Sequence, residues 1–250
     1  MTRFNILTLF PGTVSCFLGE SILKRSIDAG IIEVNLVDIR EHSTDRHGKV
    51  DDYPFGGGRG MLLTPDPLFR AIESLDRRGE LIYLTPMGSR LDQGLVRELA
   101  GMSVLTLLCG HYEGVDHRVV QRLVDREVSL GDFVLTGGEI AAAALVDAVT
   151  RELDDTLGNR ASRLEESFDA SGLLEYEQYT RPAEYRGMKV PDVLLSGNHA
   201  EIERWRTRRR LANTLDRRPD VLKKLDLPAE YLALLKEIEQ ERSDERGERD

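Results

Sequence analysis

Residues 81–139 read LIYLTPMGSRLDQGLVRELAGMSVLTLLCGHYEGVDHRVVQRLVDREVSLGDFVLTGGE, and this stretch decides the fold. Short apolar runs alternate with segments of helical periodicity, and a glycine-bearing turn follows each apolar run. Alternation of this kind produces a parallel sheet with helices on both faces. The sequence therefore predicts an α/β fold. It also predicts N-caps at Asp66 and Asp92 and a last strand over residues 127–135.

The glycine-bearing turns span residues 84–90, 108–116 and 129–139, and a fourth, FGGGRGM, spans residues 55–61. Loops at the carboxyl ends of parallel strands are where α/β folds bind ligands, and glycine allows the main chain to approach a ligand closely. Tight turns that only reverse the chain are the alternative, but they do not require the tyrosine and acidic residues found here. We therefore predict a small-molecule pocket built mostly from main chain.

The pattern extends outward from this stretch in both directions. Apolar runs at residues 4–10 and 31–39 read as further strands, and residues 139–149 form an alanine-rich helix. Beyond residue 153 the strand signal gives way to a loop and then to helices alone. We predict an α/β domain over residues 1–153, an interdomain linker over 154–178 and a small all-helical domain over 179–250.

Composition narrows the class of protein. With 40% hydrophobic and 31% charged residues, the 250-residue chain is typical of a globular protein. It has no apolar run near the roughly 20 residues that a membrane-spanning helix needs, and its start does not read as a signal peptide. Cys16 and Cys109 show neither a disulfide framework nor metal-ligand spacing, which favours a cytoplasmic location and predicts no metal site.

The charge is distributed unevenly along the chain. The net charge is −10, yet residues 199–218 carry seven arginines against three acidic residues. A local basic face can bind phosphate whatever the total charge, although an arginine-rich helix face that is merely solvated has the same composition. Trp205 lies inside this run, where it suits either base stacking or packing.

The glycine turns lack both common phosphate-binding patterns. No G-x-G-x-x-G follows the first strand, and no G-x-x-x-x-G-K-[ST] occurs. Cofactors held through phosphate are therefore disfavoured. The apolar residues Leu84, Leu130, Phe133 and Leu135 better suit an adenosine that carries a sulfonium, although composition alone indicates this only weakly.

Eight ordered motifs resemble the bacterial tRNA (guanine37-N1)-methyltransferases, which belong to the SPOUT class of S-adenosylmethionine-dependent enzymes. The resemblance covers nearly the whole chain. The motifs are FNILTLFP (4–11), VDDYPFGGGRGM (50–61), LTPMG (84–88), LCGHYEGVD (108–116), SLGDFVLTGGE (129–139), DAVTR (147–151), YTRP (179–182) and VLLSGNHAEIERWR (193–206).

The resemblance implies an α/β domain with a carboxyl-terminal trefoil knot, a helical tRNA-binding domain, and a homodimer that shares each active site between subunits. It implies methylation of N1 of guanosine 37 in tRNA, with S-adenosylmethionine as cofactor and dependence on Mg²⁺. No metal-ligand cluster is visible in the sequence.

The resemblance also implies two catalytic residues. Arg151 would stabilise negative charge on O6 of the guanine, and Glu166 stands where the family has an aspartate that removes the N1 proton. Glutamate can accept the same proton but is one methylene longer, so this departure puts the rate in doubt. Asp169 is the alternative base. A helix-terminal arginine and solvated linker acids are the structural alternatives.

The remaining implied positions fall into two groups. The cofactor would contact the three loops, and Glu113 would also face the target base; the residues are Tyr83, Leu84, Pro86, Gly88, Gly110, Tyr112, Glu113, Ser129, Leu130, Gly131, Asp132, Phe133, Val134, Leu135, Gly137 and Gly138. The anticodon stem would contact His199, Trp205, Arg206 and Arg209. His111 stands where many relatives carry arginine, and the role of Arg59 is open.

Two other functions remain open at this point. The Glu166 change could leave a tRNA-binding protein of the same fold with weakened catalysis. A nucleotide-binding α/β protein without an RNA partner is the third possibility. Methyl transfer to unmodified tRNA distinguishes an active methyltransferase from a tRNA-binding protein with weakened catalysis. Salt-dependent tRNA binding excludes a nucleotide-binding protein without an RNA partner.

Overall fold

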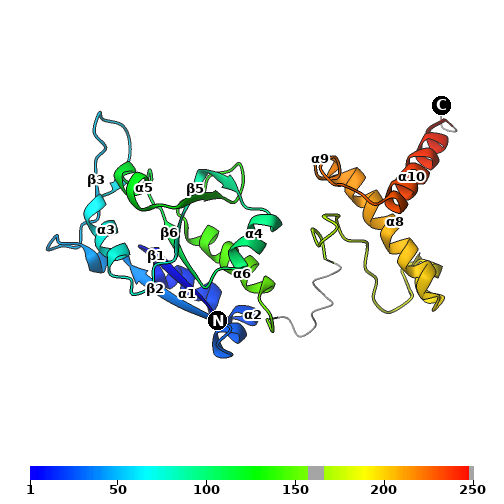
Figure 1. Cartoon of the computed structure of the whole chain (residues 1–250), viewed down its shortest axis with the longest axis horizontal. Helices are drawn as coiled ribbons and strands as arrows, with labels where there is room; N and C mark the ends of the chain where they lie inside the picture. The colour runs from blue at the N-terminus through cyan, green and yellow to red at the C-terminus, as the bar shows by residue number, and fades with distance from the viewer. Residues whose placement is uncertain (157–165, 248–250) are drawn as a thin grey trace. The chain divides into compact units, whose positions relative to one another are not determined.

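The computed structural model describes residues 1–156 and 166–247. It divides into two compact units, Met1–Gly158 and Asn159–Asp250, referred to below as the N-terminal and C-terminal units (Figure 1). No helix within the described residues is both long enough and apolar enough to span a bilayer.

The N-terminal unit is built on a five-stranded sheet of order β2-β1-β6-β5-β7. Every neighbouring pair in this sheet is parallel, which confirms the predicted α/β fold with a parallel sheet. The strands are β1 (Thr2–Thr8), β2 (Ile32–Asp38), β5 (Glu80–Arg90), β6 (Val104–Cys109) and β7 (Arg126–Ser129).

Successive residues of the central strands point into two separate hydrophobic cores. Ile82 and Leu107 belong to one core, while their neighbours Leu81 and Leu108 belong to the other. This is the two-residue period of a strand that is buried on both faces. One face is covered by α1 (Pro11–Leu18), α2 (Ser21–Asp28), α4 (Gln93–Ala100) and α6 (Glu139–Glu152), and the other by α3 (Pro65–Glu73) and α5 (His117–Leu123) (Figure 1).

Local signals placed most of these elements, with three differences. Asp92 caps α4 as predicted, because its carboxylate accepts a hydrogen bond from the Leu95 amide at 2.9 Å. Asp66 is not an N-cap: the cap lies two residues earlier, at Thr64, and α3 begins at Pro65. A short helix begins at Pro11, where the sequence suggested only the end of a strand.

The third difference is the last strand of the sheet. β7 ends at Ser129, whereas the sequence predicted a strand through residue 135. The Ser129 hydroxyl accepts a hydrogen bond from the Gly131 amide at 3.1 Å and so turns the chain away from the sheet. Residues 130–138 are thereby released to form a loop.

The long polar segment between β2 and α3 holds little regular structure. It contains a 3₁₀ turn, η1 (Ile39–His42), and a minimal antiparallel pair, β3 (Asp51–Asp52) with β4 (Leu62–Leu63). The turn of residues 55–61 joins the two short strands.

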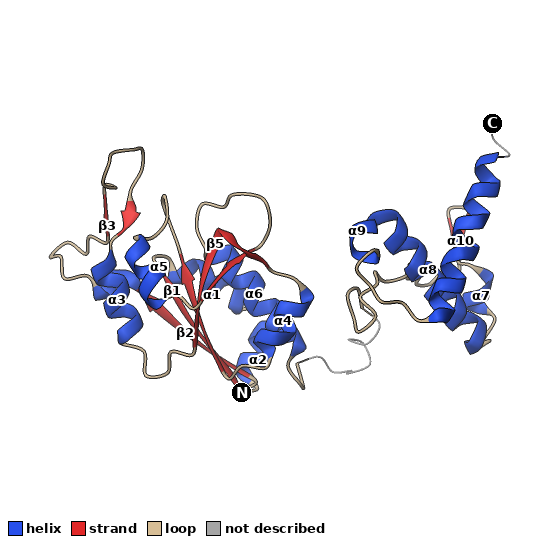
Figure 2. Ribbon diagram, turned by 45° about the horizontal axis from the view of Figure 1, so that its top comes forward, coloured by secondary structure: helices blue, strands red, loops and turns tan. Residues whose placement is uncertain are grey.

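The C-terminal unit is mainly helical. It contains α7 (Asp192–Leu195), α8 (His199–Arg217), α9 (Pro219–Leu222) and α10 (Ala229–Gly247) (Figure 2). The prediction of an all-helical domain is wrong in one respect, since β8 (Glu184–Tyr185) and β9 (Met188–Lys189) form a small antiparallel hairpin.

The C-terminal unit begins earlier than residue 179. Leu173 is fully buried with Leu211, and the Leu174 amide donates a hydrogen bond to the Thr214 hydroxyl at 2.9 Å. Residues 166–178, the second half of the predicted linker, therefore pack against α8. Residues 157–165 of the predicted linker lie outside the described part of the chain.

Candidate functional site

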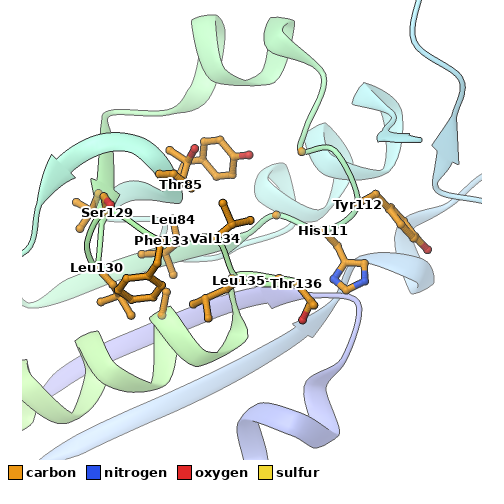
Figure 3. Close-up of a pocket in the computed structure, with 18 of the residues that line it drawn as sticks. Leu84, Thr85, His111, Tyr112, Ser129, Leu130, Phe133, Val134, Leu135 and Thr136 are labelled. Atoms are coloured by element: carbon orange, nitrogen blue, oxygen red, sulfur yellow. The ribbon is translucent and has the colours of Figure 1, made fainter. Parts of the chain in front are cut away.

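The three predicted loops surround one cavity of about 250 Å³ at the carboxyl ends of β5, β6 and β7. Figure 3 shows Leu130 and Phe133 toward one end of this cavity and His111 and Tyr112 toward the other. The strand ends bring these loops together because neighbouring parallel strands finish at the same edge of the sheet.

The third loop reaches the second by passing the end of β5. The Gly138 amide donates to the Gly110 carbonyl at 2.9 Å, and Gly137 forms an antiparallel bridge with His111. The approach is close enough that a Cβ on Gly138 would lie 2.6 Å from the Cα of Cys109. Since Gly138 has an ordinary φ of −82°, space rather than backbone conformation requires glycine here.

The structure gathers most of the predicted cofactor residues around this cavity. Those that line it are Tyr83, Leu84, Pro86, Gly110, Tyr112, Glu113, Ser129, Leu130, Gly131, Phe133, Val134, Leu135, Gly137 and Gly138.

Gly88 and Asp132 do not line the cavity. A Cβ on Gly88 would lie 2.3 Å from the Val128 amide nitrogen, so this glycine permits β5 and β7 to approach at an irregular register. Asp132 faces solvent and forms an ion pair with Arg90 at 2.7 Å. Sequence position within a loop did not reveal which way each residue faces.

The sequence reasoning missed six residues of the wall. Most are the immediate neighbours of predicted residues, and the loop motifs could have indicated them; the six are Thr85, His111, Gly114, Val128, Thr136 and Ala141. Ala141 is the exception, because it comes from the first turn of α6 and had no motif to signal it.

The cavity lies beside a buried carboxylate. Glu139, which is 6% exposed, accepts a hydrogen bond from the Thr8 hydroxyl at 2.6 Å. Burial, together with the Glu139 carboxylate, raises the pKa of the Cys109 thiol well above its usual value. Cys109 is therefore a packing residue and not a nucleophile.

The fourth glycine turn also reaches the cavity. The Glu113 amide donates to the Met61 carbonyl at 3.0 Å, and a Cβ on Gly60 would lie 2.4 Å from the Glu113 side chain. Glycine at position 60 has a φ of +86°, which other residues rarely adopt. The 55–61 turn is thus held against a residue of the cavity wall, while the role of its Arg59 stays open.

The catalytic candidates lie in different units. Arg151 lies in the last turn of α6 in the N-terminal unit, and Glu166 begins the described part of the C-terminal unit. Glu166 is partly exposed, and its carbonyl accepts a hydrogen bond from the Asp169 amide at 3.2 Å.

Asp169, the alternative base, is built into the C-terminal unit. Its carboxylate forms an ion pair with Arg210 at 2.7 Å and accepts hydrogen bonds from the Ser171 amide and hydroxyl. Burial raises the pKa of Asp169, but these bonds outweigh burial and hold the pKa below its usual value. A buried carboxylate that is already paired is poorly suited to accept a substrate proton.

We expect Asp169→Asn to lower the stability of the C-terminal unit by about 1–3 kcal/mol at pH 7, because Arg210 loses a buried charged partner. The folded-state pKa of Asp169 lies below the unfolded value of about 3.9. Its stabilisation is therefore present above that pH and is lost as the pH falls through the folded pKa, so the difference between wild type and variant shrinks in acid.

Thermal unfolding followed through Trp205, the single tryptophan, reports on this unit directly. Asp216→Asn is the matched control, since its ion pair with Arg242 is exposed and expected to contribute little. Equal stability changes in the two variants would contradict the structural role of Asp169.

The predicted RNA contacts of α8 already have partners within the chain. Arg209 forms a two-point ion pair with Glu177. Arg206 pairs with Glu203 at 2.7 Å and lies over the Tyr176 ring at 4.9 Å, and that ring also packs against Trp205. His199 is exposed at the start of the helix.

The same pairing extends along the helix. Arg204 and Arg208 pair with Glu237 and Glu241 of α10, and Arg210 pairs with Asp169. The basic composition of residues 199–218 therefore overstates the positive charge that α8 presents in this structure.

No metal site accompanies the cavity. Over residues 1–156 and 166–247, no three His, Cys, Asp or Glu side chains come together in a way that could hold an ion. The resemblance implied dependence on Mg²⁺, but this part of the chain contains no such group of ligands for the ion.

The chain is similar to known proteins over nearly its whole length. The family model described as tRNA (Guanine-1)-methyltransferase TrmD matches residues 2–224. A tRNA (guanine-N(1)-)-methyltransferase of Caldanaerobacter subterraneus subsp. tengcongensis is 53% identical, covering 94% of this chain and 97% of its own length. The corresponding protein of Geobacillus kaustophilus is 50% identical, with 96% and 99% covered. The chain therefore belongs to the tRNA (Guanine-1)-methyltransferase family.

Proposed function

We propose that this protein transfers a methyl group from S-adenosylmethionine to N1 of guanosine 37 of tRNA, next to the anticodon. The observation that carries the proposal is the convergence of the three glycine loops on one cavity, with Gly110, Gly137 and Gly138 in its wall. Family membership supports the reaction class, and the cavity supports the cofactor.

The cavity wall suits this cofactor. Main chain at the glycines can reach the adenine and ribose by hydrogen bonds, while Leu84, Leu130 and Leu135 supply apolar surface. The charged groups nearest the pocket are few, which suits a ligand that carries no phosphate. When it is bound, S-adenosylmethionine supplies an electrophilic methyl group on a sulfonium.

The protein must make N1 of guanine nucleophilic. N1 carries a proton, so we assign Glu166 as the general base that accepts it while the N1 electron pair forms the new N–CH₃ bond. Negative charge grows on O6 as the proton leaves, and Arg151 would stabilise that charge. The bond between the methyl carbon and sulfur breaks in the same step, which leaves S-adenosylhomocysteine.

We assign tRNA binding to the C-terminal unit, with His199, Trp205, Arg206 and Arg209 as contacts. Arg206 and Arg209 must exchange their carboxylate partners for phosphates to take this role. Such an exchange lowers the net gain in free energy for each contact, because an existing ion pair is lost.

The remaining features follow from the family resemblance and stay proposals. They are a trefoil knot in the N-terminal unit, a homodimer that shares each active site between subunits, and a cytoplasmic location. The path of the third loop, which returns from β7 past β5 to the end of β6, supports the knot. No step is assigned to Mg²⁺, since the described residues contain no group of three His, Cys, Asp or Glu side chains that could hold an ion.

The test is methyl transfer from labelled S-adenosylmethionine to unmodified tRNA, followed by mass analysis for N1-methylguanosine beside the anticodon. We expect labelled product at position 37. Tight tRNA binding without product would favour the alternative, a tRNA-binding protein of this fold with weakened catalysis. Absence of both would contradict the proposal.

A further inference from the structure

The β8–β9 hairpin projects an exposed segment from the C-terminal unit. All residues from 179 to 189 are exposed, and the large apolar side chains among them are Tyr179, Tyr185 and Met188. Met188 is 65% exposed. Tyr185 and Met188 form a cross-strand pair of the hairpin, and exposed apolar side chains that lie together in this way indicate a contact surface.

The turn of this hairpin contains an unusual residue. Arg186 and Gly187 form a two-residue connection with φ values of +54° and +80°, the pattern of a type I′ turn. Asn or Gly is strongly preferred at the first of these positions, and an arginine there is held in a sparsely populated conformation. The arginine therefore occupies a position that local folding preferences do not favour, at the tip of the hairpin.

The hairpin is also locally basic. Residues 179–189 contain three basic residues, Arg181, Arg186 and Lys189, and one acidic residue, Glu184, in a chain of net charge −10. Among the residues that the structure describes, Arg181 and Arg186 have no carboxylate partner. Lys189 and Glu184 approach only to 4.0 Å, and both are well exposed.

This differs from the neighbouring α8. Arg204, Arg208 and Arg209 of that helix each form an ion pair with a carboxylate. A phosphate that binds these three arginines must displace their carboxylates, whereas a phosphate that binds Arg186 displaces only water. The hairpin therefore offers positive charge that is not already paired with a carboxylate.

We infer that the β8–β9 hairpin is a tRNA-binding surface, in which Arg186 and Lys189 contact backbone phosphates. The Arg186 guanidinium lies 5.2 Å from the centre of the Tyr185 ring, an arrangement that also offers a stacking surface to an unpaired base. The positive charge of the segment, with three basic residues against one acidic residue, suits a polyanion such as tRNA. The inference rests on the proposed function, since it assumes that tRNA is the substrate.

The test uses the full chain and the double variant Arg186→Asn, Lys189→Gln. Asn suits the left-handed turn, so the hairpin should persist while two positive charges are lost. We expect the plot of log binding constant for unmodified tRNA against log salt concentration to flatten by about 2, roughly one unit for each lost phosphate contact. Between 50 and 200 mM salt, the wild type should lose about tenfold more affinity than the variant.

The matched control is the double variant Arg204→Gln, Arg208→Gln, which removes the same charge from the same unit at paired positions. We expect its salt slope to match the wild type. An unchanged slope in the hairpin variant, or an equal flattening in both variants, would overturn the inference. So would a change in oligomeric state of the hairpin variant with no change in slope, because the hairpin would then bind protein.

The outcome is separable from that of the proposed function. Failure of the wild type to methylate unmodified tRNA would contradict the function, whereas an unchanged slope beside normal wild-type methylation would contradict only the hairpin. Thermal unfolding followed through Trp205, which lies in the same unit, serves as the folding control for all variants.

Discussion

Glu166→Gln is expected to lower the single-turnover rate of tRNA methylation by about 10²–10⁴-fold, the usual effect of removing a positioned general base. Glutamine keeps the size and hydrogen bonding of the side chain but cannot accept the N1 proton at neutral pH. Affinities for tRNA and for S-adenosylmethionine should change little, because the carboxylate acts on the reacting atom. The measurement is rapid-quench methylation of one unmodified transcript by saturating enzyme.

Two further variants test the assignment. Glu166→Asp introduces the residue of the family pattern and should retain or raise the rate. Asp169→Asn should chiefly destabilise the C-terminal unit, because the ion pair with Arg210 is lost. At low temperature, where the unit is folded, this variant should methylate tRNA at the wild-type rate. If Glu166→Gln has a normal rate while folded Asp169→Asn is inactive, the general base is Asp169 and not Glu166. Normal rates for both would mean that the proton leaves by another route.

Gly138→Val is expected to abolish S-adenosylmethionine binding that calorimetry detects in the wild type. The added Cβ would lie 2.6 Å from the Cα of Cys109 and 3.1 Å from the Gly110 amide nitrogen, and backbone atoms of a buried strand cannot move aside cheaply. The loop must shift away from β6, which separates two walls of the cavity. Overpacking of this kind also costs about 1–3 kcal/mol of stability.

Two milder substitutions give a graded comparison. A Cβ on Gly110 would lie 3.0 Å from the Tyr83 side chain, a longer approach than at Gly138 and one that meets no backbone atom, so Gly110→Ala should weaken binding less. Gly12→Ala is the matched control in the same unit, since nothing lies within 4 Å of the added methyl group. Unchanged cofactor binding in folded Gly138→Val would contradict the cavity as the cofactor site.

Much of this protein could be predicted from local patterns. The two-residue repeat of apolar residues identified the strands, and the 3.6-residue repeat identified the helices that pack on the sheet. A buried strand or helix must carry its apolar side chains at the repeat of its own backbone. Glycines after each strand indicated the ligand-binding edge of the sheet, since main chain without a Cβ can approach a ligand or a neighbouring loop most closely. Ordered motifs then indicated the family, which the comparisons confirmed.

Other features depend on contacts between residues far apart in sequence. The hydrogen bond from Thr8 to Glu139 joins residues 131 positions apart, and no local pattern predicts it. The direction of each loop side chain is decided in the same way: Gly88 serves strand packing and Asp132 faces solvent, although both lie in cofactor motifs.

The clearest division concerns charge. The sequence by itself determined where the arginines lie, and the helical period placed them along α8. Only the tertiary structure decided that Arg204, Arg208, Arg209 and Arg210 are neutralised, because their carboxylate partners come from α10 and from residues 169 and 177. Coulomb energy depends on distance through space and on exposure to water, not on separation along the chain, so charge available to a ligand emerges only when the chain is folded.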